Sequence, residues 1–340
     1  MWSIENTTPF AAGQAFTQHD QTGEVVWMVA LKATFDMDME TNRPIIADEQ
    51  EDPSDADEFK DDPINSSLAK CCDFALAKQN VDVWLDATAY SPGGEPVTEL
   101  MTGVIVGSVR KTLTVYGNRY YDRFLGILYH SPPNKFNHMP ITYEKAYGGW
   151  ERSKKDEFPP YEHRNPAGTG FFKRRSSAID QTLPNIEYPG FPTKRKSKKN
   201  RIAGYGPIPL HWEPRAQYAG TIENNPERDV SVVRPKDFNP LFYQKAPQDQ
   251  QLQNVTGGEP VILYNMHPEH SEIQSCLPTI DITFESLIEN ETYKQSGKLQ
   301  SIIIHPEKLK LQMVWQANIR NGRDASAIKG TKISHTIHKL

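Results

Sequence analysis

Alternation between apolar and polar residues recurs along this chain and predicts β-strands. It is visible over residues 81–90, 111–116, 279–284 and 309–315, and a strand turns successive side chains to opposite faces, which gives a period of two. The run over 25–35 is instead almost continuously apolar, with β-branched and aromatic residues, as in a strand buried on both faces. The pattern predicts a mainly β protein.

Turn residues separate these runs. Ser91–Gly94 and Gly117–Asn118 interrupt the first series, and His305–Lys308 interrupts the last pair. Strands that alternate with amphipathic helices, as a parallel sheet requires, are not visible in the pattern. The expected fold is two antiparallel, sandwich-like β lobes.

Residues 131–250 have a different character, because prolines and aromatic residues recur throughout them. Proline prevents long regular elements but lowers the entropy lost on folding. The expected organisation is an N-terminal β lobe over 1–130, an irregular segment over 131–250 that wraps the core, and a C-terminal β lobe over 251–320. A loose polar tail is expected over 321–340.

Composition narrows the class of protein. The 340 residues carry a formal net charge of −5, which gives no overall attraction to nucleic acid. Three cysteines, of which Cys71 and Cys72 are adjacent, cannot form a disulfide framework. The first residues do not resemble a signal peptide, and no apolar run approaches the length of a membrane span. A cytoplasmic location without membrane or nucleic-acid binding is therefore expected.

Two charged runs stand out. Residues 48–62 contain nine acidic residues and one lysine, and residues 194–201 contain six basic residues. The acidic run is expected to be a solvated loop, with a metal or a basic partner as the alternative. The basic run is expected to be a mobile loop, with nucleic acid or an acidic partner as the alternatives.

Enzyme motifs are not evident. There is no Gly-x-Ser-x-Gly pattern, and Cys71, Cys72 and Cys276 have no local activating context. Gly168–Gly170 precedes basic residues, but a turn rather than a strand leads into it, unlike a phosphate-binding loop.

Metal and cofactor signals are weak. His267 with His270, and His335 with His338, are spaced three apart, but zinc needs three or four ligands. The sequence thus predicts no catalytic residue, no metal, no cofactor and no small-molecule substrate.

The irregular middle offers candidates for partner binding. Aromatic and arginine side chains dominate the binding energy of protein interfaces when they are desolvated there. Trp150, Tyr205, Trp212 and Arg215 are the residues expected to contact a partner. The alternative is that they pack inside the protein and hold the middle segment in place.

An ordered set of short motifs resembles a large bacterial family of type VI secretion accessory proteins, classified as a domain of unknown function. The set spans nearly the whole chain, up to Trp315. It comprises the opening residues 2–12, Tyr143–Gly149, Asn165–Phe171, Leu183–Glu187 and Ala246–Gln251, with shorter matches between them.

The resemblance implies a non-catalytic adaptor or chaperone. Such a protein would bind a toxin that carries a PAAR-like spike tip and help to load it onto the VgrG spike, so its partners would be that toxin and VgrG. The family provides no catalytic residues to transfer. Two alternatives remain open: a secreted structural component of the spike, and an enzyme whose site short motifs do not reveal.

Overall fold

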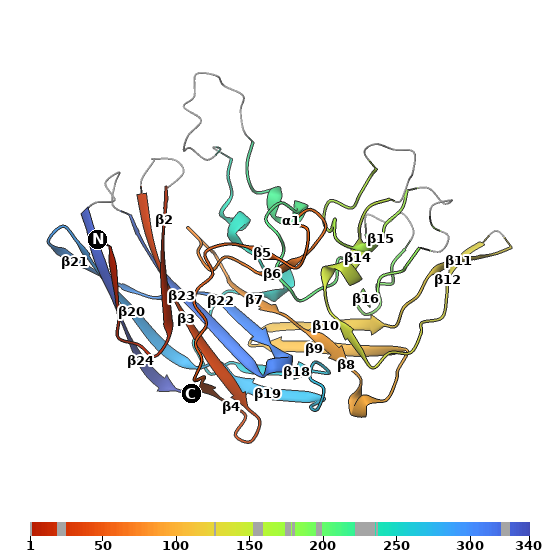
Figure 1. Cartoon of the computed structure of the whole chain (residues 1–340), viewed down its shortest axis with the longest axis horizontal. Helices are drawn as coiled ribbons and strands as arrows, with labels where there is room; N and C mark the ends of the chain where they lie inside the picture. The colour runs from red at the N-terminus through yellow and green to blue at the C-terminus, as the bar shows by residue number, and fades with distance from the viewer. Residues whose placement is uncertain are drawn as a thin grey trace.

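Strands dominate the structure, a computed structural model, and the prediction of a mainly β chain is confirmed. Three larger sheets form an elongated body, with the four-stranded sheet at one end and a projecting hairpin at the other (Figure 1). The structure describes residues 2–18, 25–125, 127–151, 159–173, 178, 181–194, 199–221, 235, 237–320 and 327–340.

A seven-stranded sheet occupies the centre. It contains the apolar run predicted over 25–35, and the alternating run over 309–315 pairs with it antiparallel. One junction, between β7 and β22, is parallel. Across the sheet the order is β17 (Gln251–Leu252), β7 (Val81–Leu85), β22 (Lys298–His305), β23 (Lys310–Arg320), β3 (Val25–Asp38) and β2 (Ala11–Gln18), and β4 (Arg43–Ile46) also pairs with β3.

A five-stranded sheet packs against one side of this centre. Along one of its strands buried and more exposed residues alternate from Val109 to Tyr116, so the period-two pattern in the sequence corresponds to a buried and an open face. Its order is β16 (Ile186–Glu187), β10 (Val109–Tyr116), β9 (Glu99–Val106), β18 (Pro260–Tyr264) and β19 (Glu272–Cys276).

The four-stranded sheet corrects the prediction for the end of the chain. A loose tail over 321–340 is wrong for residues 328–339, which form the long strand β24, while 321–326 lie outside the described residues. Its sheet order is β1 (Ser3–Asn6), β24 (Ile328–Lys339), β20 (Thr279–Ile288) and β21 (Glu291–Ser296).

The reason for this strand is a buried face that the polar composition conceals. Ile328, Thr331 and Ile333 are buried. The Thr331 hydroxyl accepts a hydrogen bond from Trp27 Nε1 at 2.8 Å and lies 2.7 Å from the Ser286 hydroxyl. Pairing on both sides and these buried contacts stabilise a strand that hydrophobicity alone does not indicate.

One hydrophobic core joins the three sheets. It contains Leu31 from β3, Ile304 from β22, Val104 from β9, Leu263 from β18 and Phe284 from β20. The two strand-rich segments, 1–130 and 251–320, thus contribute to the same core and the same sheets. The strands assigned to two separate lobes are therefore interleaved within shared sheets.

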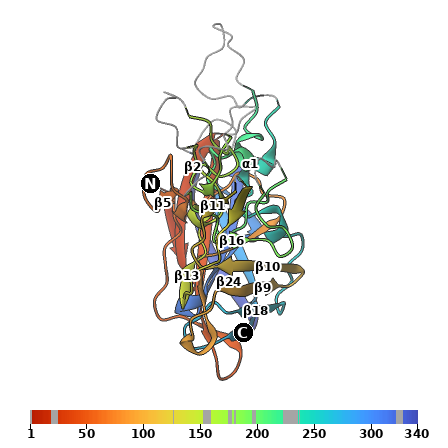
Figure 2. The same ribbon diagram turned by 90° about the vertical axis from the view of Figure 1, so that its right-hand side faces the viewer.

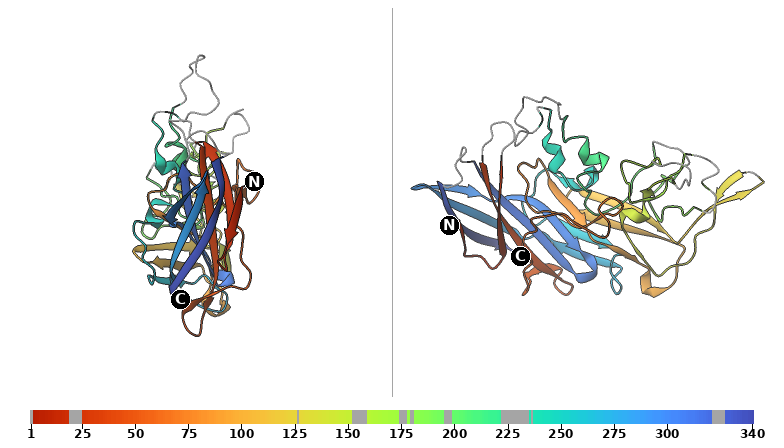
Figure 3. Two further views of the ribbon diagram at one scale, coloured as in Figure 1. Left: turned by 90° about the vertical axis from the view of Figure 1, so that its left-hand side faces the viewer. Right: turned by 45° about the horizontal axis from the view of Figure 1, so that its top comes forward.

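The middle of the chain forms only short elements, as the prolines indicate, and most of it lies along one long edge of the body (Figures 1 and 2). The tilted view separates this layer from the sheets below it (Figure 3). Its elements are β13 (His138–Pro140), η2 (Tyr143–Lys145), β14 (Tyr147–Gly148), β15 (Thr169–Gly170), α1 (Glu213–Ala216), η4 (Pro240–Tyr243) and η5 (Gln248–Gln250).

Candidate functional site

Two of the four predicted partner contacts, Trp212 and Arg215, lie inside the protein. Trp212 is 0% exposed and its ring meets Tyr143 edge-on at 5.4 Å. Arg215, on α1, is 4% exposed; its Nε donates to the Phe242 carbonyl at 3.0 Å and its Nη1 to the Ile208 carbonyl at 2.8 Å. These two side chains hold the middle segment together, so their assignment as surface contacts is corrected.

Tyr205 is also interior. Its hydroxyl donates to the Thr102 carbonyl at 3.1 Å, and its carbonyl accepts from Leu85 N at 3.0 Å, which attaches the middle segment to β9 and β7. Trp150 is half-buried and stacks on Tyr161 with ring centroids 4.0 Å apart. Trp150 is therefore the one predicted contact that retains partial exposure.

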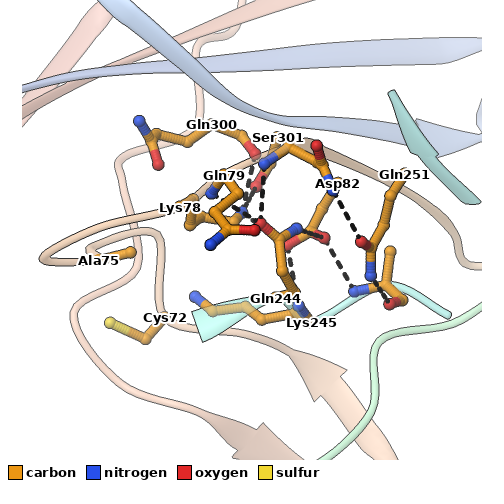
Figure 4. A network of polar contacts seen from close by, with 12 residues as sticks. Cys72, Ala75, Lys78, Gln79, Asp82, Gln244, Lys245, Gln251, Gln300 and Ser301 are labelled. Carbon is orange, nitrogen blue, oxygen red and sulfur yellow. Dashed lines mark hydrogen bonds and ion pairs between the residues drawn. The ribbon is translucent and has the colours of Figure 1, made fainter. Parts of the chain in front are cut away.

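A buried charged network fastens the middle segment to the central sheet (Figure 4). Lys78 Nζ lies 2.6 Å from Asp82 Oδ2 and donates to the Gln300 carbonyl at 2.7 Å. Asp82 accepts from Gln244 Nε2 at 2.8 Å and from the Lys245 backbone N at 2.9 Å. Burial lowers the pKa of Lys78, although Asp82 favours its charged form. The network is fully internal, which indicates a structural role.

Two motif segments of the sequence cross at close range. β14 pairs in parallel with β15. A side chain at Gly149, where φ is 89°, would place a Cβ 2.2 Å from the Gly168 carbonyl oxygen. Glycine is needed here because the two backbones pass too close together for a side chain. The Gly168–Gly170 segment also lacks the strand-to-helix geometry of a phosphate-binding loop.

A polar cleft of about 600 Å³ lies beside the central sheet. Its floor is the outer face of the central sheet. One wall comes from the acidic segment and the hairpin of β5 (Glu58–Phe59) and β6 (Leu68–Lys70). The cleft is lined by Lys32, Thr34, Glu49, Gln50, Glu51, Ser54, Glu58, Ala69, Lys70, Cys71, Asp73, Trp84, Asp86, Ile303, His305, Lys308, Lys310 and Gln312.

The acidic run over 48–62 is built into this wall rather than left as a solvated loop. Ser54 N donates to Asp73 Oδ2 at 2.9 Å, and Cys72 N donates to Asp57 Oδ1 at 2.8 Å. Glu51 lies 3.3 Å from the buried Lys32 Nζ, so the run carries one half of an ion-pair network. That part of the expectation is corrected.

Ionisation of Glu51 should make stability depend on pH. Burial acts to raise its pKa, but the charge of Lys32, with Gln312 and Lys70, outweighs it and lowers the pKa from 4.5 to about 2. Stability from the carboxylate is then complete above pH 4.5 and is lost as the pH falls towards 2. Because the side chain is 39% exposed, solvent screening reduces the effect to about 1 kcal/mol.

The measurement is urea unfolding of the wild type and Glu51→Gln between pH 7 and pH 3. We expect the variant to be less stable than the wild type at pH 7. The difference between their free energies of unfolding should become smaller at acid pH. A gap that stays constant across this range would contradict the assignment of the stabilisation to the ionised carboxylate.

The cysteines and histidines considered for catalysis or metal binding take part in packing and turns. Burial raises the pKa of the Cys71 thiol to about 12, which keeps it protonated and unreactive. His267 Nδ1 accepts hydrogen bonds from Glu269 N and His270 N, so this pair shapes a turn. Within the described residues no group of three or more histidine, cysteine or acidic side chains is placed to hold a metal.

The basic run over 194–201 is described only at its ends. Residues 195–198, on which the prediction of a mobile loop falls, lie outside the described residues. Asn200 Oδ1 accepts from Lys194 N at 2.9 Å, and the guanidinium of Arg201 lies 3.8 Å from the ring centre of Phe191. The two ends are thus held together and against an aromatic side chain.

The β11–β12 hairpin (Tyr121–Phe124 and Ile127–His130) is anchored by one face. Tyr121 is buried and meets the Phe172 ring edge-on at 5.0 Å. Leu183 is buried in the same small cluster, and Leu128 packs against it. Tyr121 N also donates to the Gln181 carbonyl. This small separate cluster fixes the base of an arm that projects from the end of the body (Figure 1).

The opposite face of the hairpin is apolar and open. Phe124 pairs with Ile127 across the hairpin, and both are 67% exposed. Leu125, at the tip, is 87% exposed and has a φ of 47°, a left-handed conformation that is unfavourable for a leucine. Tyr120 and Tyr129 extend this outer face towards the base.

Sequence reasoning missed this surface. The stretch from Phe124 to Leu128 has four large apolar residues around one glycine, where a hairpin turn usually carries asparagine, aspartate or a second glycine. An apolar turn of this kind was the available signal.

A family model described as "Uncharacterized protein conserved in bacteria (DUF2169)" matches residues 22–316. The chain belongs to this family. Neither the curated proteins nor the solved structures gave a match. No helix among the described residues is long and apolar enough to cross a membrane.

Proposed function

We propose that this DUF2169 protein is a non-catalytic adaptor that binds a PAAR-like toxin and helps to load it onto the VgrG spike of a type VI secretion system. The observation that carries the proposal is the β11–β12 hairpin. It presents Phe124, Leu125 and Ile127 to solvent on an arm whose base is fixed in a core. Exposed apolar patches on otherwise well-packed proteins mark interaction sites.

The resemblance of the ordered motifs to type VI accessory proteins supports the choice of partner, and the exposed hairpin supports the proposal that the partner binds there. The geometry of the arm suits insertion into an apolar groove of another protein, because its side chains are already fixed in direction by cross-strand pairing. The positive φ at Leu125 suits the first central position of the two-residue turn between Phe124 and Ile127, so the turn fixes the tip and leaves the Leu125 side chain exposed.

The test is a triple variant, Phe124→Ser, Leu125→Ser and Ile127→Ser. The wild type should co-purify with a PAAR-like toxin or VgrG of its own bacterium. The variant should lose at least about 30-fold in affinity, because even one desolvated apolar anchor among the three would contribute about 2 kcal/mol. Its melting temperature should change little, since these side chains are exposed.

The matched control is Leu287→Ser with Tyr293→Ser, two exposed residues of the four-stranded sheet at the other end of the body. This variant should bind like the wild type. If wild type and triple variant bind equally, the hairpin is not the interface. If the wild type captures neither toxin nor VgrG, and a deletion strain still delivers the toxin, the adaptor function is wrong.

The secreted spike component remains the second candidate. It predicts the protein in the culture medium during active secretion, at levels comparable to VgrG, whereas an adaptor should stay largely in the cells. The elongated body and the projecting arm are compatible with both roles.

A further inference from the structure

The polar cleft is separate from the hairpin and has a chemistry of its own. We propose that the cleft is a peptide-binding site that takes an extended segment carrying a lysine or arginine side chain. Its volume of about 600 Å³ falls within the range of ligand-binding pockets in proteins. This proposal does not depend on the identity of the partner at the hairpin.

The floor of the cleft is the first argument. β7, β22, β23 and β3 turn one face to the main core, and their outer face carries a second, smaller buried cluster. Phe74, Leu68 and Cys71 pack on the apolar part of this outer face, around Trp84 and Ile303. The polar part, with Thr34, His305 and Gln312 among others, forms the floor of the cleft. Thr34 and Gln312 are 4% and 3% exposed, so an extended segment in the cleft would lie over a floor that is itself mostly buried.

Ring nitrogens in the lining supply the second argument. Trp84 is 3% exposed, and its Nε1 has no hydrogen-bond partner among the described residues; the same holds for His305 Nδ1. The two rings meet edge-on at 6.2 Å, and both residues line the cleft. An indole N–H can only donate a hydrogen bond, whereas a neutral imidazole has one donor and one acceptor. A peptide backbone provides a carbonyl to accept and an N–H to donate.

The charges at the cleft supply the third argument. Three of the four lining lysines are neutralised: Lys32 by Glu51 and Asp73, Lys70 by Glu51, and Lys310 by Asp36.

Glu49 and Glu58 have no ion pair among the described residues, and Lys308 is the one lining lysine without such a pair there. Asp86 is 51% exposed and is paired only with the surface residue Lys60 and, at 3.9 Å, with His305. The remaining field is negative and favours a cationic side chain.

The experiment uses three blocked glycine–serine peptides of equal length with a central lysine, glutamine or glutamate. Binding is followed by the indole N–H resonance of Trp84 in the full chain, assigned with Trp84→Phe. The lysine peptide should shift this resonance to saturation. The glutamate peptide should bind about 10-fold more weakly, and the glutamine peptide should lie between them.

A double variant, Glu58→Gln with Asp86→Asn, should reduce the lysine-over-glutamate preference to about 2-fold or less. The matched control, Glu99→Gln with Glu291→Gln, removes two carboxylates outside the cleft and should keep the preference. Melting temperatures of both variants verify that they fold. The proposal is overturned if no peptide shifts the Trp84 resonance, if all three bind alike, or if both variants lose the preference equally.

Discussion

Replacing Trp212 with alanine should lower the free energy of unfolding by about 3–5 kcal/mol, the loss typical of a large aromatic residue removed from a core. Trp212 is fully buried and packs edge-on against Tyr143. Its backbone N–H and carbonyl also take part in the turn that starts α1. Denaturant unfolding followed by circular dichroism measures the change.

The control for Trp212→Ala is Phe124→Ala, which removes an aromatic side chain that is largely exposed. This substitution should alter stability by no more than about 0.5 kcal/mol. A loss of less than about 1 kcal/mol in Trp212→Ala would mean that Trp212 is not a core residue and would restore it as a candidate contact for a partner.

Removing the buried carboxylate of Asp82 should have an effect of similar size. Asp82→Ala leaves the Lys78 ammonium buried without its counter-charge and leaves Gln244 Nε2 and the Lys245 N–H without their acceptor. Breaking a buried ion pair from one side costs about 3–5 kcal/mol. The middle segment should detach first, so we expect increased proteolysis over residues 239–251 together with a lower midpoint of unfolding.

Double replacement separates the charge effect from the loss of packing. Lys78→Met with Asp82→Leu should be less destabilising than Asp82→Ala alone, because no uncompensated charge remains inside. Glu5→Ala, which breaks the exposed pair with Lys332, should be nearly neutral. If the double variant is the least stable of the three, the hydrogen bonds of the network matter more than its charges.

Local pattern was sufficient to predict most of the strands. The alternating run at 279–284 lies within β20, and the apolar run at 25–35 lies within β3. These elements are visible because one face of each, or both, is buried by apolar side chains. β24 was missed because its burial is shared between isoleucine and a hydrogen-bonded threonine, and polar residues occupy most of its positions.

The sites depend on contacts that no local pattern contains. Trp212 and Arg215 have the residue types of interface anchors, but Tyr143 and Phe242, which cover them, come from distant parts of the chain. The cleft combines Lys32 from β3, Asp86 from the residue after β7 and His305 from β22, which are far apart in sequence. Residue type indicated that these aromatic and charged groups matter, and only the fold decides which of them remain accessible.

The interleaving of early and late strands has a consequence for the newly made chain. β3 pairs with β23 along most of its length, and β7 depends on β22, so both early strands have open edges until the last part of the chain is synthesised. Long-range pairing of this kind slows folding, and unpaired edges promote aggregation. A product terminated before Lys298 would retain those exposed edges, and expression of the protein in fragments should therefore fail where the full chain succeeds.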